Sequence, residues 1–345
     1  MNKPFQFDSE ARFDCSGCTK CCRARWNIRV DEERFERLKG SRLALELELR
    51  DGRSPFYEKA SGAVVTHRRQ GACAFLEENL CSIHARHGGL AKPLTCQLFP
   101  FVIQETPEAL VVGVSHYCSA VARGEGRPLA AHLDGLERLR PELEMTPLGG
   151  APIVVAVQLR LDWSGYLQLE AGLIERLGKG PAEAVLLGLI EGLGQWLETG
   201  QQPPLEHLLV GGRPWLDEAM LEAGAVALVT WAESRKSEQR LELSAQLRRR
   251  EAVLLPSSGV AVDYQGKAPQ PELLAYLRSL IFRKFLVRRE PLLTALIALA
   301  CLERALGYYG TAFSAGLDAL ELLLSHGDGG HEALTPLTEL ALAQS

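Results

Sequence analysis

The crowding of cysteines toward one end is the feature that most constrains this chain. The 345 residues include nine cysteines, and eight of them lie between Cys15 and Cys118. The ninth, Cys301, stands alone in the rest of the sequence. Such an uneven distribution indicates two parts. We predict a cysteine-cluster metal-binding module over residues 1–126 and a helical domain over residues 127–345.

The N-terminus and the apolar stretches indicate a reducing compartment. Residues 1–14 lack the apolar run and the small-residue cleavage site of a secretory signal. The longest apolar stretch, Leu292–Leu302, is shorter than the roughly 20 residues that span a bilayer. We therefore expect a cytoplasmic protein with no membrane partner. Thiols stay reduced in the cytoplasm, so disulfides are a poor explanation for many cysteines.

Composition and charge indicate an ordinary globular protein and argue against a nucleic-acid partner. The chain is 46% hydrophobic and 23% charged, which is ordinary for a globular protein, and a chain of this length can bury a large core without help from a metal. Its formal net charge of −5 argues against nucleic acid as a partner. The cysteines therefore need an explanation of their own.

The first four cysteines form a CxxCxxCC run: Cys15, Cys18, Cys21 and Cys22. On a helix, the first, second and fourth would fall within about 60° of one another, whereas Cys21 would point further round. Adjacent residues also diverge on an extended chain. The vicinal pair is therefore a poor fit to two corners of one tetrahedron. Either one of the two cysteines belongs to a second metal site, or one bridges two metals.

Four further cysteines complete a set of eight: Cys73, Cys81, Cys96 and Cys118. Residues 73–84 predict a hairpin, and residues 110–114 predict a strand ahead of Cys118. Zinc and iron–sulfur cubanes each take four thiolates, so eight can supply two four-coordinate sites. The fourth cysteine directly follows the third, unlike in the bacterial ferredoxin run, so spacing alone leaves iron–sulfur and zinc open. Four histidines are weaker candidates as ligands: His67, His84, His87 and His116.

Hydrophobic periodicity predicts helices elsewhere. Residues 31–50 have helical spacing with Asp31 as the N-cap, and residues 152–161 fit either a strand or a helix. Leucine-rich helical segments follow at 128–141, 163–178, 181–198, 215–249, 271–289, 291–308 and 312–325. The predicted fold class is α+β, mostly helical: a small cysteine-rich module with short strands, followed by an all-helical domain. Cys301, in an Ala/Leu-rich helix, is expected to be a buried hydrophobe.

Other chemistry finds little support in the sequence. There is no G-x-S-x-G elbow for a serine hydrolase and no G-x-G-x-x-G after a strand. Cys118 and His116 would share a face of a strand, but the metal role is the better use of Cys118. The basic run at residues 283–289 fits a solvated helix face, or a surface that docks an acidic partner.

These motifs together carry a resemblance. The segments are FDCSGCTKCC at 13–22, CAFL at 73–76, CSIH at 81–84 and PLTCQLFPF at 93–101. In order and spacing they resemble the CxxCxxCC family of zinc- or iron-chelating proteins. Residues 21–31 are similar to the corresponding stretch of flagellin lysine-N-methylases, where a CC pair precedes an aromatic residue and an alternating apolar segment. Residues 281–286 also resemble the C-terminal half of that subgroup.

The resemblance has consequences beyond the spacing. The family implies metal binding, and the methylase subgroup implies an iron–sulfur cluster, with 4Fe–4S favoured over zinc. The subgroup also implies methyl transfer from S-adenosylmethionine to a lysine of a protein substrate such as flagellin. The residues by themselves identify neither catalytic groups nor a methyl-donor site. The alternative is a non-catalytic protein that carries, senses or transfers zinc or iron.

Overall fold

The computed structural model describes most of the chain in two compact units. The described residues are 3–24, 26, 28–156, 159–201, 203–204, 208, 215–234, 237–251, 253–255, 260–262, 270–288, 291–326, 335 and 338–339. The cysteine unit comprises Phe7–Val102 and Val112–Glu144. The helical unit comprises Met1–Gln6, Ile103–Val111 and Met145–Ser345. The expected domain boundary between residues 126 and 127 stays a prediction.

Short helices and short paired strands make up the cysteine unit. Its helices are α1 (Lys20–Arg23), α2 (Glu32–Lys39), α3 (Arg42–Asp51), α4 (Ser82–His87), α5 (Leu94–Leu98), α6 (Ser119–Ala122) and α7 (Leu133–Leu139), with 3₁₀ turns η1 (Gly89–Ala91), η2 (Leu129–His132) and η3 (Arg140–Glu142). Its strands form four antiparallel pairs: β2 (Arg12–Phe13) with β11 (Arg127–Pro128), β3 (Phe56–Glu58) with β4 (Val64–Thr66), β5 (Arg68–Arg69) with β6 (Ala72–Cys73), and β7 (Leu76–Glu77) with β8 (Leu80–Cys81).

One sheet among the described residues has three strands. Its order is β1-β10-β9, with β1 at Phe5–Phe7, β9 at Phe101–Glu105 and β10 at Leu110–Val114. The predicted strand at 110–114 is therefore confirmed. All of β10 is buried, as its unbroken apolar sequence requires.

The predicted helix at 31–50 is two helices instead of one. Asp31 caps α2 as expected, since its side chain accepts a hydrogen bond from the Arg34 N–H at 3.1 Å. α2 ends at Gly40, and the Ser41 hydroxyl then caps α3 by accepting from the Ala44 N–H at 3.2 Å. Gly40 and Ser41 interrupt the helix, although the hydrophobic periodicity of residues 31–50 predicts one continuous helix.

The predicted hairpin at 73–84 is confirmed over its centre. β7 and β8 pair with Leu76 opposite Cys81, and the turn residues Glu78 and Asn79 have φ values of 46° and 64°. Two residues of positive φ are what a tight hairpin turn requires. Cys73, however, belongs to the preceding hairpin β5–β6.

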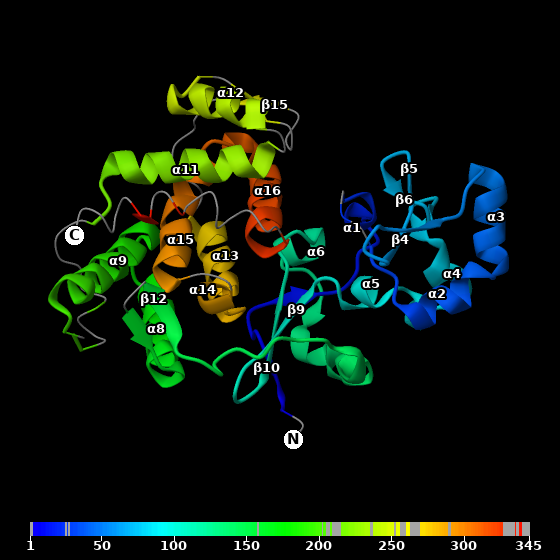
Figure 1. Cartoon of the computed structure of the whole chain (residues 1–345), viewed down its shortest axis with the longest axis horizontal. Helices are drawn as coiled ribbons and strands as arrows, with labels where there is room; N and C mark the ends of the chain where they lie inside the picture. The colour runs from blue at the N-terminus through cyan, green and yellow to red at the C-terminus, as the bar shows by residue number, and fades with distance from the viewer. Residues whose placement is uncertain are drawn as a thin grey trace. The chain divides into compact units, whose positions relative to one another are not determined.

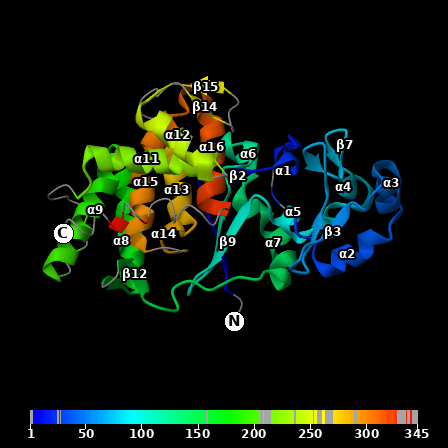
Figure 2. The ribbon, with the colours of Figure 1, turned by 45° about the horizontal axis from the view of Figure 1, so that its top comes forward.

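Two small hydrophobic clusters form the core of the cysteine unit. The first lies among α2, α3 and the hairpins and contains Val30, Leu38, Leu43, Ala44, Leu47, Phe56, Phe75 and Ile83. The second lies around α6 and contains Phe13, Val114, Ala120, Val121 and Leu129. Helices α2, α3 and α4 gather beside the hairpins in both views (Figures 1 and 2), and α3 packs against α2 and α4.

The helical unit is built around one buried helix. Its helices are α8 (Trp163–Leu177), α9 (Ala182–Thr199), α11 (Glu218–Glu233), α12 (Ser237–Arg248), α13 (Gln270–Phe282), α14 (Phe285–Arg288), α15 (Leu292–Gly307), η4 (Gly310–Ala312) and α16 (Phe313–His326). Every residue of α15 is buried, and α9, α11, α14 and α16 pack against it (Figure 1). None of the described helices combines the length and the apolar character needed to cross a membrane.

The predicted fold class is confirmed, with local differences. Of the described residues, 57% are helical, and the strands are short and lie in small sheets. The C-terminal part is not all-helical, because it contains the hairpins β12 (Ile153–Ala156)–β13 (Leu159–Leu161) and β14 (Val253–Leu255)–β15 (Val260–Val262). The first of these settles the ambiguous segment 152–161 as strand. The periodic segments 215–249 and 271–289 each divide into two helices.

Arg283 and Lys284 of the basic run are buried, contrary to both expectations for it, whereas Arg288 is half-buried. Arg283 forms a bidentate ion pair with buried Glu321, with distances of 2.8 and 3.1 Å. Lys284, whose φ is 61°, pairs with buried Glu170. The turn between α13 and α14 directs the two cations to different helices. Arg289 lies outside the described residues.

Candidate metal centre

All eight module cysteines lie in the cysteine unit as free thiols. The loop after β2 contains Cys15 and Cys18, α1 contains Cys21 and Cys22, β6 and β8 contain Cys73 and Cys81, α5 contains Cys96, and Cys118 directly precedes α6. The first two are exposed and the other six are half-buried. Cys301 is fully buried in α15 of the helical unit, as predicted.

The CxxCxxCC run is a loop followed by one helical turn. Gly17 and Thr19 have φ values of 66° and 61°, so the helix begins only at Lys20. The left-handed backbone of Thr19, a β-branched residue, is an unfavourable conformation. The run therefore does not present its cysteines on one continuous helix face.

The vicinal thiols of Cys21 and Cys22 interact directly. A hydrogen bond between the two side chains lowers the pKa of Cys21 to about 7 and raises the pKa of Cys22. The pair therefore releases one proton readily and holds the second. The thiolates of Cys73 and Cys81 also raise the pKa of Cys22, which means that charges at the hairpins act on α1.

Burial is the main influence on the pKa of both Cys73 and Cys96. Burial raises the pKa of Cys73, while the Phe75 N–H and the Thr66 hydroxyl donate to its sulfur and oppose the rise. Burial, followed by the charge of Cys73, raises the pKa of Cys96 to about 12, and Lys92 opposes the rise. Without a metal, these thiols keep their protons at neutral pH. A bound cation would favour the thiolates and release the protons.

Cys18 and Cys118 meet at the start of α6. Burial opposes ionisation of Cys18, but the Lys20 N–H and the hydroxyls of Ser119 and Ser16 outweigh it and lower its pKa. Burial raises the pKa of Cys118, and two backbone N–H groups of α6 donate to its sulfur. Hydrogen bonds to sulfur of this kind are a feature that tunes metal–thiolate centres.

Arginine side chains join the segments that carry these cysteines. The Arg68 guanidinium donates to the carbonyl oxygens of Ala24, Gly71 and Arg23, the last at 3.0 Å. It thereby connects the end of α1 to the β5–β6 hairpin. Arg23 donates to the Asn79 side chain at 3.2 Å, which connects α1 to the β7–β8 turn.

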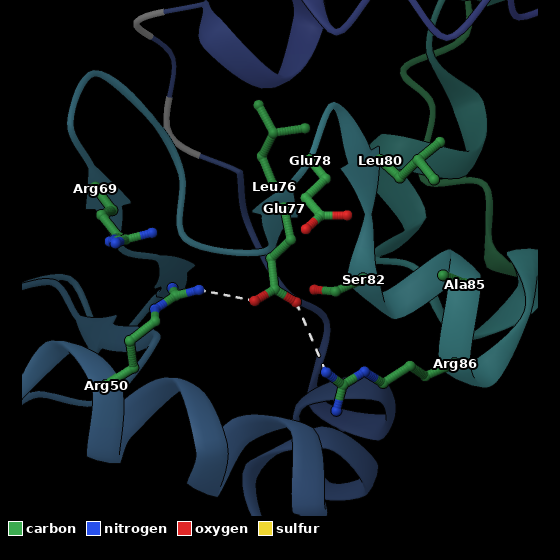
Figure 3. A pocket seen from close by; sticks show the side chains of 9 residues that line it. All are labelled: Arg50, Arg69, Leu76, Glu77, Glu78, Leu80, Ser82, Ala85 and Arg86. Carbon is green, nitrogen blue, oxygen red and sulfur yellow. Dashed lines mark hydrogen bonds and ion pairs between the residues drawn. The ribbon is translucent and has the colours of Figure 1, made fainter.

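A charged hollow of about 510 Å³ lies behind the β7–β8 hairpin (Figure 3). Glu77 reaches toward Arg50 on α3 at 2.7 Å and toward Arg86 on α4 at 3.9 Å. Arg50 also donates to the Ala74 carbonyl at 3.5 Å, a long contact next to Cys73. These ion pairs fix the position of the hairpin, and no cysteine lines the hollow.

Asp31 positions a third segment. One of its oxygens caps α2, and the other accepts from the Leu94 N–H at 3.1 Å, at the start of α5. Burial opposes ionisation of Asp31, but the hydrogen bonds from Leu94 and Arg34 outweigh it and lower the pKa. The carboxylate therefore holds α5, and with it Cys96, against the rest of the unit.

An aromatic cluster lies among the cysteine segments. The Trp26 ring is 5.2 Å from the Phe99 ring and 5.1 Å from the Tyr117 ring, measured between centroids. The Lys20 ammonium lies over the Tyr117 ring, 4.7 Å from its centroid. That distance is within the range of cation–π attraction. Each ring is within four residues of a cysteine in sequence.

The eight thiols offer the ligand chemistry that soft metals prefer. Thiolates are soft ligands that suit zinc and iron–sulfur clusters, and N–H donors to sulfur are present at Cys18, Cys73 and Cys118. The residues therefore fit such a group chemically. Among the described side chains, no three of His, Cys, Asp or Glu are arranged to hold a single metal ion.

Sequence reasoning identified the thiols but not their supports. Asp31 was found as an N-cap, whereas its second hydrogen bond, to Leu94, spans 63 residues and has no local signal. The roles of Arg23, Arg50 and Arg68 depend on contacts between segments in the same way. Of the histidines, His67 packs edge-to-face on Tyr57 with centroids 4.9 Å apart, and burial lowers its pKa.

Comparisons with known proteins identify the class of domain. Residues 14–119 match the family described as "CxxCxxCC: Putative zinc- or iron-chelating domain". The match confirms the predicted resemblance over these residues. The similarity to flagellin lysine-N-methylases remains a prediction.

A curated relative is similar over part of the chain. An uncharacterized protein of Methanocaldococcus jannaschii is 30% identical over 116 residues, which are 33% of this chain and 38% of the relative. The match thus covers well under half of either protein. No solved structure matches the chain.

Proposed function

We propose that the protein binds iron through its module cysteines, as iron–sulfur of the 4Fe–4S type, in which each cluster would take four of the eight thiolates. The observation that carries the proposal is that all eight free thiols lie in one compact unit, within the residues that match the zinc- or iron-chelating domain. Charges on Cys73 and Cys81 act on Cys22, and charges on Cys18 and Cys21 act on Cys118. The domain match supports zinc or iron chelation, and the resemblance to the methylase subgroup favours iron.

Metal binding on these residues follows from their protonation chemistry. Hydrogen bonding to Cys21 raises the pKa of Cys22, and burial raises the pKa of Cys73, Cys96 and Cys118. Cation binding at these thiols would therefore release protons. The backbone N–H donors at Cys73 and Cys118 would stabilise the negative charge of the sulfurs in a metal-bound thiolate.

Anaerobic purification followed by iron, zinc and sulfide analysis tests this proposal. We expect iron and acid-labile sulfide in equal amounts, with broad visible absorption. A colourless chain with stoichiometric zinc and no sulfide would replace iron–sulfur by zinc. A Cys18→Ala variant should bind less metal, whereas Cys301→Ala should bind as much as the wild type.

The second candidate function is methyl transfer from S-adenosylmethionine to a protein lysine, with flagellin as a substrate class. The aromatic cluster of Trp26, Phe99 and Tyr117 favours it, because aromatic rings attract ammonium and sulfonium groups. Lys20 already places an ammonium group over one ring. Calorimetry of the metal-loaded protein with S-adenosylmethionine tests this function. No heat of binding would favour the non-catalytic carrier or sensor of zinc or iron.

A further inference from the structure

The charged hollow behind the β7–β8 hairpin is separate from the thiols. Its volume is about 510 Å³, and no cysteine lines it. Three arginines face it, Arg50, Arg69 and Arg86, together with the carboxylates of Glu77 and Glu78 (Figure 3). Binding sites for small organic molecules have volumes of roughly 300–1,000 Å³, so the hollow is large enough for such a ligand.

Carboxylates outside the hollow hold its three arginines. Arg50 donates to Asp51 through two nitrogens, at 2.7 and 2.8 Å, and Arg69 lies 3.1 Å from the same carboxylate. Arg86 donates to Glu46. Neither Asp51 nor Glu46 lines the hollow. These pairs orient the guanidinium groups and leave other N–H groups of the arginines for a ligand.

Glu77 extends from β7 into the hollow, between two of these arginines (Figure 3). One of its oxygens accepts from Arg50 at 2.7 Å. The other lies 3.9 Å from Arg86, which is too far for a hydrogen bond. Arg69 lines the same hollow, but it pairs with Asp51 and not with Glu77. A single carboxylate thus satisfies one arginine well and the second only loosely.

The ion pairs around the hollow form a chain that begins and ends with an arginine. In order, its members are Arg42, Glu46, Arg86, Glu77, Arg50, Asp51 and Arg69. Four arginines therefore share three carboxylates. The hydrogen bond from Arg50 and the charges of Arg69 and Arg53 lower the pKa of Asp51, so Arg53 adds a fifth cation nearby. Glu78 is the fourth carboxylate, and one positive charge is left over.

We propose that the charged hollow binds a small phosphate monoester, and that Glu77 occupies the phosphate position until the ligand binds. A phosphoryl group carries roughly two negative charges and three acceptor oxygens, so it can satisfy Arg50 and a second arginine at once. Guanidinium groups bind phosphate through two parallel hydrogen bonds. Leu80, which lines the hollow and is 63% exposed, offers an apolar surface to the ester group. No thiol takes part, so this site is independent of the proposed function.

Calorimetry of the full-length chain, with its metal as purified, tests the site with phenyl phosphate as the probe. Glu77→Gln keeps the size of the side chain and removes the competing charge. It should bind phenyl phosphate roughly tenfold more tightly than the wild type, because a hydrogen bond to a charged group is worth about 1.5–3 kcal/mol. A Glu77→Gln chain with no saturable binding would overturn the proposal.

Arginine substitutions in the Glu77→Gln chain test where the probe binds. Arg69→Ala and Arg86→Ala should each lower the affinity for phenyl phosphate roughly tenfold. Arg37→Ala is the matched control and should have no effect, because this exposed arginine of α2 pairs with Glu33 outside the hollow. Equal affinity in all three variants would place the probe elsewhere and overturn the proposal. Unchanged hydrogen exchange of α3 and α4 verifies that the variants fold.

Inorganic phosphate as a second probe tests the ester part of the ligand. It has the same charged group as phenyl phosphate but nothing to place against Leu80. We expect it to bind more weakly than phenyl phosphate to the Glu77→Gln chain, and Leu80→Ser should remove the difference. Equal affinity of the two probes for the unsubstituted Leu80 chain would overturn the assignment of an ester.

Discussion

The two units stabilise themselves in different ways. The helical unit has one large apolar core, with α15 buried along its whole length, and its buried charges meet partners within the protein. The cysteine unit has two small clusters, and its half-buried thiols repel one another when ionised. A core that small is marginal by itself. The contrast suggests that one unit is held by packing and the other by its metal.

The comparison also separates two uses of buried polar groups. In the helical unit, Glu321 accepts from Arg283 and from the Tyr276 hydroxyl, the latter at 2.7 Å, so its charge is compensated internally. In the cysteine unit, burial and the charges of nearby thiolates raise the pKa of Cys96 to about 12, and Lys92 opposes the rise. An incoming metal supplies the compensation that the helical unit builds from side chains.

Metal removal should have the largest effect on stability, and it should destabilise only the cysteine unit. Structural zinc contributes roughly 10–16 kcal/mol of apparent folding free energy in small metal domains. We expect chelation under reducing conditions to remove amide protection from β5–β8 and α5 while α15 keeps its protection. Hydrogen exchange with mass spectrometry measures both in one sample. Equal protection before and after chelation would contradict the contrast.

Breaking the buried Arg283–Glu321 ion pair should destabilise the helical unit and leave metal binding by the cysteine unit unchanged. Glu321→Ala leaves the Arg283 guanidinium buried without its carboxylate, at a cost of about 3–5 kcal/mol. Thermal unfolding should show a lower transition for the helical unit with unchanged metal content. The double variant Arg283→Met, Glu321→Leu should recover much of the loss, since it removes both charges. A fall in bound metal instead would show that the units are not independent.

Sequence patterns predicted the elements better than their boundaries. The predicted helices at 163–178, 181–198, 291–308 and 312–325 each correspond to one observed helix, because long amphipathic or apolar repeats are strong signals. The breaks at Gly40-Ser41 and at Arg283-Lys284 were missed. In both places local capping or a buried ion pair overrides the periodicity.

The candidate site was predictable in its ligands and not in its assembly. Cysteine spacing identifies thiols without any fold. Which thiols meet depends on contacts such as Arg68 with Ala24, which joins residues 44 positions apart. The burial of Arg283 and Lys284 could not be predicted either, because a run of charged residues indicates an exposed surface unless its buried partners are known.

The arginine that joins α1 to the β5–β6 hairpin gives a smaller test within the cysteine unit. Arg68→Ala removes hydrogen bonds to the carbonyls of Ala24, Arg23 and Gly71 without touching a thiol. Outer-shell changes of this kind typically cost 10–100-fold in metal affinity. Competition with a coloured chelator measures the affinity. Arg42→Ala, on the exposed face of α3, is the control and should have no effect.

The smallest expected effect concerns pH and the cap at Asp31. Its pKa is below the ordinary value of 3.8, so its stabilisation is fully present above about pH 4 and is lost as the pH falls through the lower, folded-state value. Asp31→Ala should therefore destabilise the cysteine unit by about 1 kcal/mol at pH 7, the usual worth of an N-cap. The difference between variant and wild type in urea unfolding should shrink as the pH falls below 4. A difference that stays constant across this range would mean that the Asp31 side chain stabilises the unit by packing. Protonation of the carboxylate weakens its hydrogen bonds but does not change its packing.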